Sequence, residues 1–379
     1  MSPARQEDPR VAGLASWARG EPAAPYSLDI SPTDWCNLKC HTCWMRNPVF
    51  KEEFRSEYQL SDARLLSLIG EAAELGVRHV ELTGGGEPML RRDVVLEMMS
   101  RVKQYGMLGS MTTNGTLFDS ESVHRIVRLG WDRLVFSVDG PDRETNDWLR
   151  PRKTAGEGEE SPFGRIVEAL IAFQREKSAQ GSALPMVALN TVLSRRNAAE
   201  VSRMVRFAAR HGVGRVSFEP LTTHSALGAE LRLSPEDVRA MQPEVREAAR
   251  MAAELGVETN IGKYAEHALV TGKNALPEVY AADVLARSGF LGIPCYEPWF
   301  HLVVKTDGSV GPCCVFEDKA VSVKEHSLRE IWTGAFLSKV RASMASREFL
   351  PWCRTCNAGQ LLQNRALRED LGHAMRVVA

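Results

Sequence analysis

Three cysteines crowd into one short segment, WCNLKCHTCWM, and this segment limits what the chain can fold around. Cys36, Cys40 and Cys43 follow a β-rich run, YSLDIS, so we expect them in the loop after a strand. Converging thiolates suit an iron-sulfur cluster or zinc. Structural zinc usually takes four protein ligands, for which His41 is available, whereas three cysteines leave one metal position open for a small molecule. The spacing alone leaves both interpretations open.

Between Tyr26 and Gly228, short β-rich runs alternate with amphipathic stretches, which predicts a parallel sheet covered by helices. A partial or complete barrel, or an open wound sheet, would hold such units. The tail predicts a hairpin that turns at Asp307 and Gly308. The predicted strands are 26–31, 78–83, 109–114, 132–138, 185–193 and 214–221, and the predicted helices are 61–76, 92–105, 119–129, 163–177, 197–210, 234–255, 327–344 and a last one from 359.

Composition excludes several classes of protein. With 44% hydrophobic and 25% charged residues, the chain has the mixture of a globular enzyme. A net charge of −1 gives no long-range attraction to nucleic acid or to anionic membranes. No run of 18 apolar residues is present, and we expect a cytoplasmic protein. Eight cysteines in 379 residues are too few for a disulfide framework.

A second segment, LTGGGEPML, follows the second predicted strand and contains Gly84, Gly85, Gly86 and Glu87. Glycines let the backbone approach a ligand closely, and Glu87 supplies a carboxylate that can pair with an ammonium group. Together with the Cys-x3-Cys-x2-Cys spacing, this segment resembles the radical S-adenosylmethionine (SAM) enzymes. The resemblance implies a partial (β/α)6 TIM-like barrel, a 4Fe-4S cluster on the three cysteines, and SAM bound at its open iron.

Further positions resemble nucleotide contacts of that family. Ser137 and Asp139 in FSVDGP end the fourth predicted strand, and Asn190 lies in the fifth, where relatives contact the methionine carboxylate or the ribose. Asp139 before Gly140 and Pro141 is also a turn former in any protein. The residue before the third cysteine is often aromatic in the family but is Thr42 here, with Trp44 two residues later.

A second set of cysteines lies in the last quarter of the chain. Cys295, Cys313, Cys353 and Cys356 suit zinc or iron when considered alone. The segments around them resemble the SPASM and twitch extensions of radical SAM enzymes, with thiols for one auxiliary 4Fe-4S cluster, as in the shorter twitch form. Cys314 is then the surplus thiol. Radical epimerases return a hydrogen atom from such a cysteine, although a packed small side chain is the alternative.

The expected fold class is therefore α/β, a partial (β/α)6 TIM-like barrel with a small C-terminal twitch or SPASM-like extension made of a β-hairpin and a helix. The chain divides by prediction into five parts. These are an N-terminal extension (1–25), the barrel core (26–232), a helical connector (233–293), the auxiliary-cluster domain (294–357) and a C-terminal helix (358–379). The charged segment 150–161 follows the fourth strand and would suit either a lid or a plain surface loop.

By resemblance, the enzyme cleaves SAM reductively to a 5′-deoxyadenosyl radical with electrons from a flavodoxin or ferredoxin. The first expectation is an oxidoreductase or epimerase acting at a hydroxyl-bearing carbon of a sugar, aminocyclitol or similar small molecule of natural-product or antibiotic biosynthesis. Modification of a precursor peptide is the alternative. The 25 residues before the first strand are too few for a leader-binding domain, which favours the small molecule. Base candidates are Glu219, His224 and Arg150.

Overall fold

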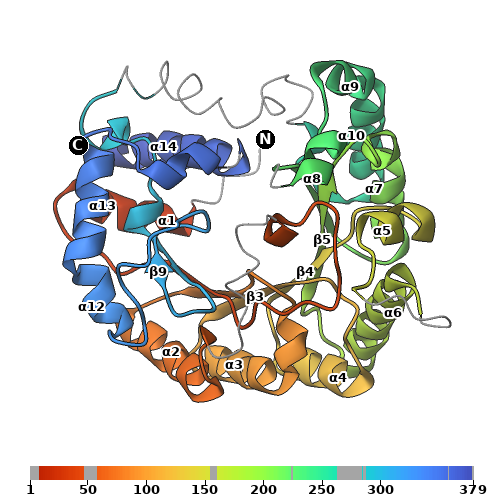
Figure 1. Ribbon diagram of the computed structural model, residues 1–379, viewed down its shortest axis with the longest axis horizontal. Helices are drawn as coiled ribbons and strands as arrows, with labels where there is room; N and C mark the ends of the chain where they lie inside the picture. Colours follow the sequence, from red (N-terminus) through yellow and green to blue (C-terminus); the bar gives the residue numbers. More distant parts are fainter. Residues whose placement is uncertain are drawn as a thin grey trace.

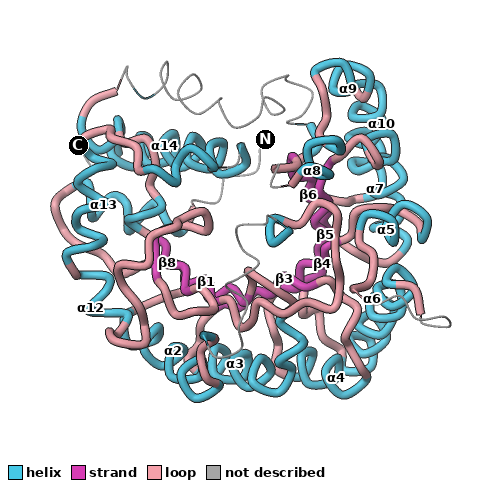
Figure 2. Tube along the Cα trace, viewed as in Figure 1, coloured by secondary structure: helices cyan, strands magenta, loops and turns pink. Residues whose placement is uncertain are grey.

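Nine strands of the described residues form one sheet, in the order β7-β6-β5-β4-β3-β2-β1-β8-β9. The structure is a computed structural model and describes residues 8–46, 58–153, 160–222, 225–262, 284, 287–356 and 358–377. All neighbouring strands are parallel except β8 and β9. The sheet curves into an open arc (Figure 2), a partial barrel as expected. The strands are β1 (Ser27–Ile30), β2 (His79–Leu82), β3 (Leu108–Thr113), β4 (Arg133–Ser137), β5 (Met186–Leu193), β6 (Arg215–Pro220), β7 (Glu258–Thr259), β8 (His301–Val304) and β9 (Val310–Gly311).

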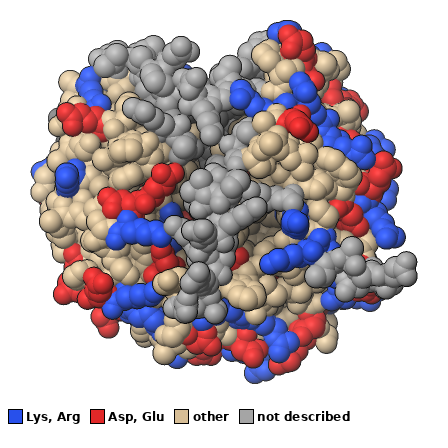
Figure 3. Space-filling model, viewed as in Figure 1, with Lys and Arg blue, Asp and Glu red and all other residues tan. Residues whose placement is uncertain are grey.

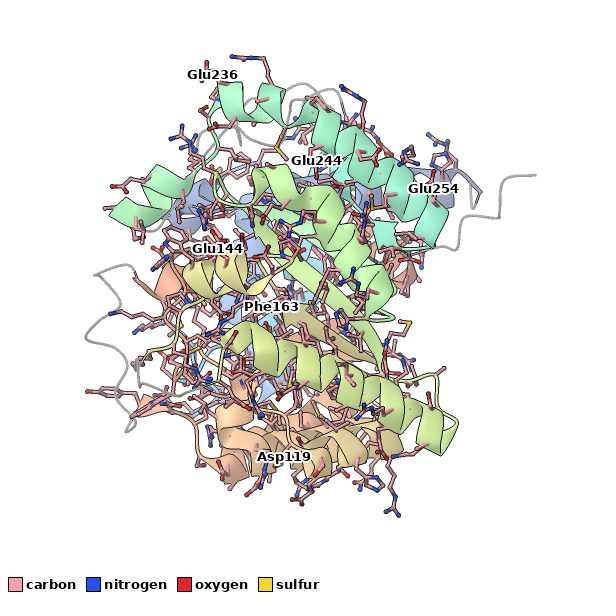
Figure 4. The ribbon with its side chains drawn as sticks, turned by 90° about the vertical axis from the view of Figure 1, so that its right-hand side faces the viewer. Asp119, Glu144, Phe163, Glu236, Glu244 and Glu254 are labelled. Carbon is pink, nitrogen blue, oxygen red and sulfur yellow. The ribbon has the colours of Figure 1, made fainter. Side chains whose placement is uncertain are left out.

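Helices line the convex side of this arc (Figure 1). Seen from the side, the layer runs from Asp119 at the start of α4, past Phe163 in α6, to Glu236 in α9 (Figure 4). Its helices are α2 (Asp62–Leu75), α3 (Arg92–Gln104), α4 (Ser120–Arg128), α5 (Arg143–Leu149), α6 (Pro162–Gln180), α7 (Val201–Arg210), α9 (Pro235–Ala240) and α10 (Gln242–Leu255), and the short α8 (Ala226–Leu231) follows β6. The other helices are α1 (Pro9–Ala18), α12 (Leu328–Thr333), α13 (Ala335–Ala345) and α14 (Ala358–Val377), with short 3-10 turns η1 (Trp44–Arg46), η4 (Pro88–Arg91), η5 (Ala198–Glu200), η7 (Gly289–Gly292), η8 (Glu297–Trp299) and η9 (Pro351–Thr355).

Strand alternation separates an apolar outer face from a polar inner face. Leu28 and Ile30 of β1 and Leu82 of β2 are buried in the main core with the covering helices. The intervening residues of the first strands, Asp29 and Glu81, lie on the opposite face because successive side chains point to opposite sides of a sheet. The concave side of the barrel is therefore lined by polar groups.

The six predicted strands and the segment-by-segment alternation with helices are confirmed. Two predicted long helices are each divided in two. The segment 234–255 forms α9 and α10, because Pro243 favours a new helix start, and 327–344 forms α12 and α13 on either side of Gly334. The tail hairpin is present as β8 and β9, with Gly308 at φ +88° in its turn.

A second apolar cluster joins the two ends of the chain. Val11 and Leu14 of α1 pack with Leu367 and Leu371 of α14 around Tyr296. No helix of the described residues has the length and apolarity needed to cross a membrane. Charges of both signs are interspersed over the described part of the face in Figure 3, in keeping with the net charge of −1.

Candidate functional site

The three-cysteine segment follows β1 and is held in place by the chain segment after α5. Lys39 donates its backbone N–H to Pro151 O (2.7 Å), His41 donates to Leu149 O (2.8 Å), and Lys153 donates to Asn37 O (3.0 Å). The start of the predicted lid is thus tied to the cysteine loop. The lid's central residues, 154–159, lie outside the described residues, so the lid stays a prediction.

Polar groups approach two of the sulfurs. The Cys36 Sγ accepts from the Leu38 backbone N–H (3.4 Å) and from Asn114 Nδ2 (3.8 Å), and the Cys40 Sγ accepts from Arg150 Nη1 (3.8 Å). Burial raises the pKa of the Cys40 thiol to about 12, even though the charge of Arg150 acts in the opposite direction. A thiolate here needs further positive charge, such as bound iron.

Arg150 forms a buried ion pair with Asp139, with 2.7 Å between Arg150 Nε and Asp139 Oδ2. The other oxygen of Asp139 accepts from the Val192 backbone N–H (2.8 Å). Protein partners therefore occupy both oxygens of this predicted nucleotide contact. Ser137 and Asn190 are paired across β4 and β5, so these two predicted contacts do lie side by side. Their roles toward the nucleotide stay predictions.

The triple-glycine segment packs against the residues that lead into the cysteine loop. A Cβ on Gly84, which has φ +108°, would meet Ser31 Oγ at 1.8 Å, and one on Gly86 would meet the backbone oxygen of Trp35 at 1.8 Å. Gly86 N also donates to Thr33 O (2.7 Å). Only glycine allows this contact between the two predicted cofactor segments.

Glu87 is buried, with 2% of its surface exposed, and links the glycine segment to the end of β3. Its carboxylate accepts from Thr113 Oγ1 (2.7 Å), the Asn114 backbone N–H (2.6 Å) and the Met89 backbone N–H (3.1 Å). Burial raises its pKa, although these three hydrogen bonds oppose the shift. Glu87 thus has a structural role that the sequence did not reveal, beside its predicted role as partner of an ammonium group.

A cavity of about 640 Å³ opens beside the glycine segment. Gly84 and Gly85 form part of its wall, Trp44 another part, and Cys314 lies in the wall with its side chain exposed. The structure therefore brings the surplus cysteine and the predicted SAM segment to one space. The remaining lining residues are Asp29, Ser31, Asp34, Tyr58, Thr83, Val303, Lys305, Thr306, Asp307, Ser309, Lys319, Ser322 and Lys324.

The second set of cysteines gathers from separate segments. Burial raises the pKa of Cys295 and of Cys313 well above the usual value, and each thiol also feels the charge of Cys356. Cys353 packs with Cys313 against Phe316 and with Cys295 against the second apolar cluster. Cys295, Cys313 and Cys353 thus border two apolar clusters that share Cys353, and Cys356 lies close enough to Cys295 and Cys313 to act on them electrostatically.

A buried chain of acid and base groups, which the sequence did not single out, connects the cavity to this region. His301 Nε2 lies 3.1 Å from Asp29 Oδ1, and His301 Nδ1 lies 2.6 Å from Glu297 Oε2. Burial alone would lower the pKa of His301, but Asp29 and Glu297 together raise it well above its usual value. The polar Asp29 within β1 and the single polar residue His301 of β8 were the available signal, but which strands pair could not be deduced from local sequence.

The three residues that the sequence suggested as a general base lie in different parts of the chain. Glu219 lies near the end of β6, and Arg150 lies beside Cys40 and Asp139. His224 lies outside the described residues. Of the acid and base groups above, Asp29 is the one that lines the cavity together with Cys314.

The donor sets fit iron-sulfur clusters. Within the described part of the chain, no three His, Cys, Asp or Glu side chains are placed to hold a single metal ion. A 4Fe-4S cluster spreads its ligands over separate irons, and N–H donors to sulfur are a regular feature of its surroundings.

Two family models match the sequence. The Radical SAM superfamily model matches residues 30–208, and the SPASM model, described as an iron-sulfur cluster-binding domain, matches residues 295–357. The chain belongs to the radical SAM superfamily. As a radical SAM protein with a SPASM domain, it uses SAM and 4Fe-4S clusters, an auxiliary cluster included.

Individual relatives of this radical SAM protein have different substrates. It is 27% identical over 329 residues to a probable GTP 3′,8-cyclase of Saccharolobus islandicus, covering 85% of this chain and 92% of the relative. It is 27% identical over 339 residues to the PqqA peptide cyclase of Methylocella silvestris, covering 88% and 80%. Among solved structures, Streptococcus suis SuiB bound to the precursor peptide SuiA matches this chain with a TM-score of 0.62 and 18% sequence identity. The match covers 84% of this chain and 67% of SuiB, and it supports the fold.

Proposed function

We propose that this radical SAM enzyme epimerises a hydroxyl-bearing carbon of a small polar molecule, such as a sugar or an aminocyclitol, with Cys314 as hydrogen donor. The observation that carries the proposal is the shared cavity, because Cys314 and the Gly84–Gly85 segment line one space. A thiol placed there can reach the same substrate carbon that faces the nucleotide. Oxidation of that carbon is the outcome if Cys314 does not donate.

In this proposal Cys36, Cys40 and Cys43 ligate the SAM-binding cluster, and Cys295, Cys313, Cys353 and Cys356 ligate the auxiliary cluster. When bound, the first cluster and SAM supply the 5′-deoxyadenosyl radical that removes a hydrogen atom from the substrate. The N–H groups that reach the Cys36 and Cys40 sulfurs stabilise the thiolate form that ligation requires.

Cys314 then gives the hydrogen atom of its S–H bond to the opposite face of the substrate carbon. The sulfur regains a hydrogen atom as one electron from a flavodoxin or ferredoxin and one proton. His301 is the candidate proton donor, because the carboxylates of Asp29 and Glu297 raise its pKa well above the usual value. Asp29 lines the cavity and can pass a proton between His301 and the substrate space.

A precursor peptide is the second candidate substrate. It is favoured by the PqqA peptide cyclase, which aligns with 88% of this chain. The probable GTP 3′,8-cyclase aligns at the same identity and points to a nucleotide-sized substrate.

The test needs no substrate. Radical SAM enzymes cleave SAM slowly without substrate, so the reconstituted enzyme is incubated with SAM and dithionite in D₂O, and the deuterium in 5′-deoxyadenosine is measured by mass spectrometry. The S–H hydrogen of Cys314 exchanges with solvent, and we expect one deuterium in most of the product. Cys314→Ala should remove this deuterium while 5′-deoxyadenosine still forms.

Ser322→Ala is the matched control, because Ser322 also lines the cavity and carries an exchangeable hydrogen in a stronger O–H bond. Its product should be labelled like that of the unchanged enzyme. Undeuterated 5′-deoxyadenosine from the unchanged enzyme would rule out Cys314 as a donor to that space and leave oxidation as the proposed outcome.

A further inference from the structure

The C-terminal helix α14 begins two residues after Cys356 and lies beyond residues 295–357, which the SPASM model matches. It packs against α1 and against the η7 turn, on the side of the molecule that also holds α13 (Figure 1). Some of its buried side chains are polar and others are apolar. Both kinds meet the segment that carries Cys295, the first of the auxiliary cysteines.

Three polar side chains of α14, Gln360, Asn364 and Arg368, form hydrogen bonds to that segment. They are spaced by four residues and therefore share one face of the helix. Asn364 is 0% exposed and Arg368 is 1% exposed, although both residue types are mostly found at protein surfaces. Burial of such groups is favourable only where hydrogen bonds compensate the loss of water. The partners of this polar face therefore matter for the stability of the region.

Arg368 holds the backbone just before the first auxiliary cysteine. Its Nε donates to Leu291 O (3.0 Å), and its Nη2 donates to Ile293 O (2.8 Å) and Pro294 O (3.3 Å). The segment 289–299 contains only two short 3-10 turns, so these carbonyl oxygens have no partners in regular secondary structure. One buried guanidinium thus fixes the path of this irregular backbone.

Asn364 and Gln360 continue the contact beyond that cysteine. Asn364 Oδ1 accepts from the Tyr296 backbone N–H (2.7 Å), and Asn364 Nδ2 donates to Gln360 O (2.9 Å). Gln360 Nε2 donates to Glu297 Oε1, whereas His301 Nδ1 lies 2.6 Å from the other oxygen, Glu297 Oε2. The polar face of α14 therefore holds the segment on both sides of its cysteine.

The apolar side of α14 meets the same region. Leu367 and Leu371 are buried in the second apolar cluster, against which Cys295 and Cys353 also pack. Cys353 and Cys356 lie in the η9 turn and directly after it, and α14 follows. The helix is thus joined through the chain to one pair of auxiliary thiols and through its side chains to another.

We infer that α14 assembles the auxiliary site, because its buried face fixes where Cys295 lies relative to Cys353 and Cys356. Arg368 and Gln360 are the positioning residues. The inference rests on the ligand set proposed above. These thiols come from separate segments, and ligands that must first be brought together weaken the binding of a metal centre. A helix that holds two of the segments in place removes that ordering step.

The test compares Arg368→Met with Cys295→Ala and Arg365→Met in the reconstituted full-length enzyme. Arg365 lies on the same helix but is exposed, with its Nε 3.6 Å from Glu369 Oε1, and its variant is the matched control. Iron and sulfide are measured together with electron paramagnetic resonance. We expect about eight irons in the unchanged enzyme and in Arg365→Met, and about four in the other two variants. The signal of the SAM-binding cluster should persist in all of them.

The other outcomes contradict the inference in distinguishable ways. About eight irons in Arg368→Met would overturn it, and so would the loss of both clusters, which would indicate general unfolding. Loss of four irons by Cys295→Ala alone would leave the ligand set standing and remove the role of α14. If Cys295→Ala also kept about eight irons, the ligand set would be wrong and the inference would fail with it.

A second readout uses the protein before clusters are inserted. Brief alkylation with iodoacetamide, followed by mass spectrometry of the peptides, measures how accessible each thiol is. Arg368→Met should speed the modification of Cys295 at least about tenfold, the equivalent of losing one hydrogen bond to a charged group. The modification of Cys36 should keep its rate. Equal rates for Cys295 in the variant and in the unchanged protein would contradict a positioning role for Arg368.

Gln360→Met tests the position of Glu297 without disturbing a fully buried side chain. Loss of the Gln360 donor leaves the Glu297 carboxylate less compensated, and this carboxylate acts on Cys295 and Cys313. The variant should keep about eight irons and lower the midpoint potential of the auxiliary cluster, because negative charge opposes the reduced state.

Gln363→Met is the matched control, since the structure records no side-chain hydrogen bond of Gln363 within the described part of α14. Its midpoint potential should equal that of the unchanged enzyme in a redox titration followed by electron paramagnetic resonance. An unchanged potential in Gln360→Met would overturn the positioning role of Gln360.

Discussion

The two sets of cysteines differ in how the chain assembles them and in the charge placed beside them. Cys36, Cys40 and Cys43 come from one loop after β1, with the cation of Arg150 next to Cys40. Cys295, Cys313, Cys353 and Cys356 come from separate segments, and the buried charge next to Cys295 and Cys313 is the carboxylate of Glu297. The first set is local in sequence and lies beside a cation, whereas the second is assembled by tertiary structure beside an anion.

This difference shows that two clusters with the same cysteine ligands can have different reduction potentials, depending on the charge beside the thiolates. A cation beside a thiolate stabilises the reduced, more negative state of a cluster, and an anion opposes it. Short spacing also places all three thiols of the first set in one loop, which the segment after α5 holds in position. The following predictions test these two contrasts, from the largest expected effect to the smallest.

The largest contrast is between Cys36→Ala and Cys353→Ala. Cys36→Ala should abolish 5′-deoxyadenosine formation from SAM, because the cluster that binds SAM loses a ligand. Cys353→Ala should retain slow cleavage of SAM while product formation stops. The measurement is 5′-deoxyadenosine by liquid chromatography, with iron content and electron paramagnetic resonance on the same samples.

A variant lacking Cys36, Cys40 and Cys43 together should lose about four irons and keep about four. Retained SAM cleavage by Cys36→Ala would contradict the assignment of the first set. Zinc in place of iron at the second set would make that region structural.

Gly86→Ala tests the contact between the cysteine loop and the glycine segment. Its new Cβ would meet the Trp35 backbone oxygen at 1.8 Å, so one of the two segments must move. We expect SAM affinity to fall at least about tenfold, measured by equilibrium dialysis with the intact cluster, since small displacements of a positioned site are costly. Gly214→Ala, where nothing lies within 4 Å of the new Cβ, is the control and should bind SAM normally.

The buried carboxyl of Glu81, in the barrel interior between the two sets of cysteines, should make the stability of the protein depend on pH. Burial raises the pKa of Glu81 to about 7, and the charge of Asp29 adds to the shift. A carboxyl whose pKa is raised on folding stabilises the protein fully below its unfolded pKa and loses this contribution as pH rises through 7. The loss is roughly 3 kcal/mol for a shift of this size.

Denaturant unfolding between pH 5.5 and 8 measures this loss, with the clusters in place. In the Glu81→Gln variant, the free energy of unfolding should fall less between these pH values, by most of the roughly 3 kcal/mol assigned to Glu81. An unchanged pH profile in this variant would assign the decline to another group.

The smallest effect concerns the charges beside the sulfurs. Arg150→Gln should lower the midpoint potential of the SAM-binding cluster, and Glu297→Gln should raise that of the auxiliary cluster. Each shift should be about 60 mV, the equivalent of 1.4 kcal/mol for a one-electron couple. Redox titration followed by electron paramagnetic resonance measures both midpoint potentials. Shifts of the same sign would contradict the proposed difference in charge between the two sets of cysteines.

Local patterns predicted the six barrel strands, the helices between them and the tail hairpin, because hydrophobic periodicity and turn residues act over short distances. They also located both cysteine sets. They could not show that β8 lies parallel to β1, since pairing between distant strands leaves no local signal. For the same reason Asp29 and His301, which meet across that pairing, were not recognised as partners.

Arg150 illustrates another limit of prediction from the sequence, which does not show the spatial neighbours of a side chain. Its charge and its place after the fourth strand suggested a base, whereas its neighbours, Cys40 and Asp139, come from two other parts of the chain. Glu87 was recognised as a functional candidate from the glycine segment. Its three protein donors could not be predicted, because they come from β3 and from the turn that Glu87 itself begins.

The pairing of β1 with β8 also sets the order in which a newly made chain can complete its fold. Ser27 and His301 are neighbours in the sheet but lie 274 positions apart along the chain. During synthesis the N-terminal strand therefore keeps one open edge until the last quarter of the polypeptide has left the ribosome. Contacts of such long sequence separation form slowly, and an exposed strand edge invites pairing with other chains. Slow or interrupted translation should thus favour aggregation through β1, and efficient production should depend on conditions that protect this edge.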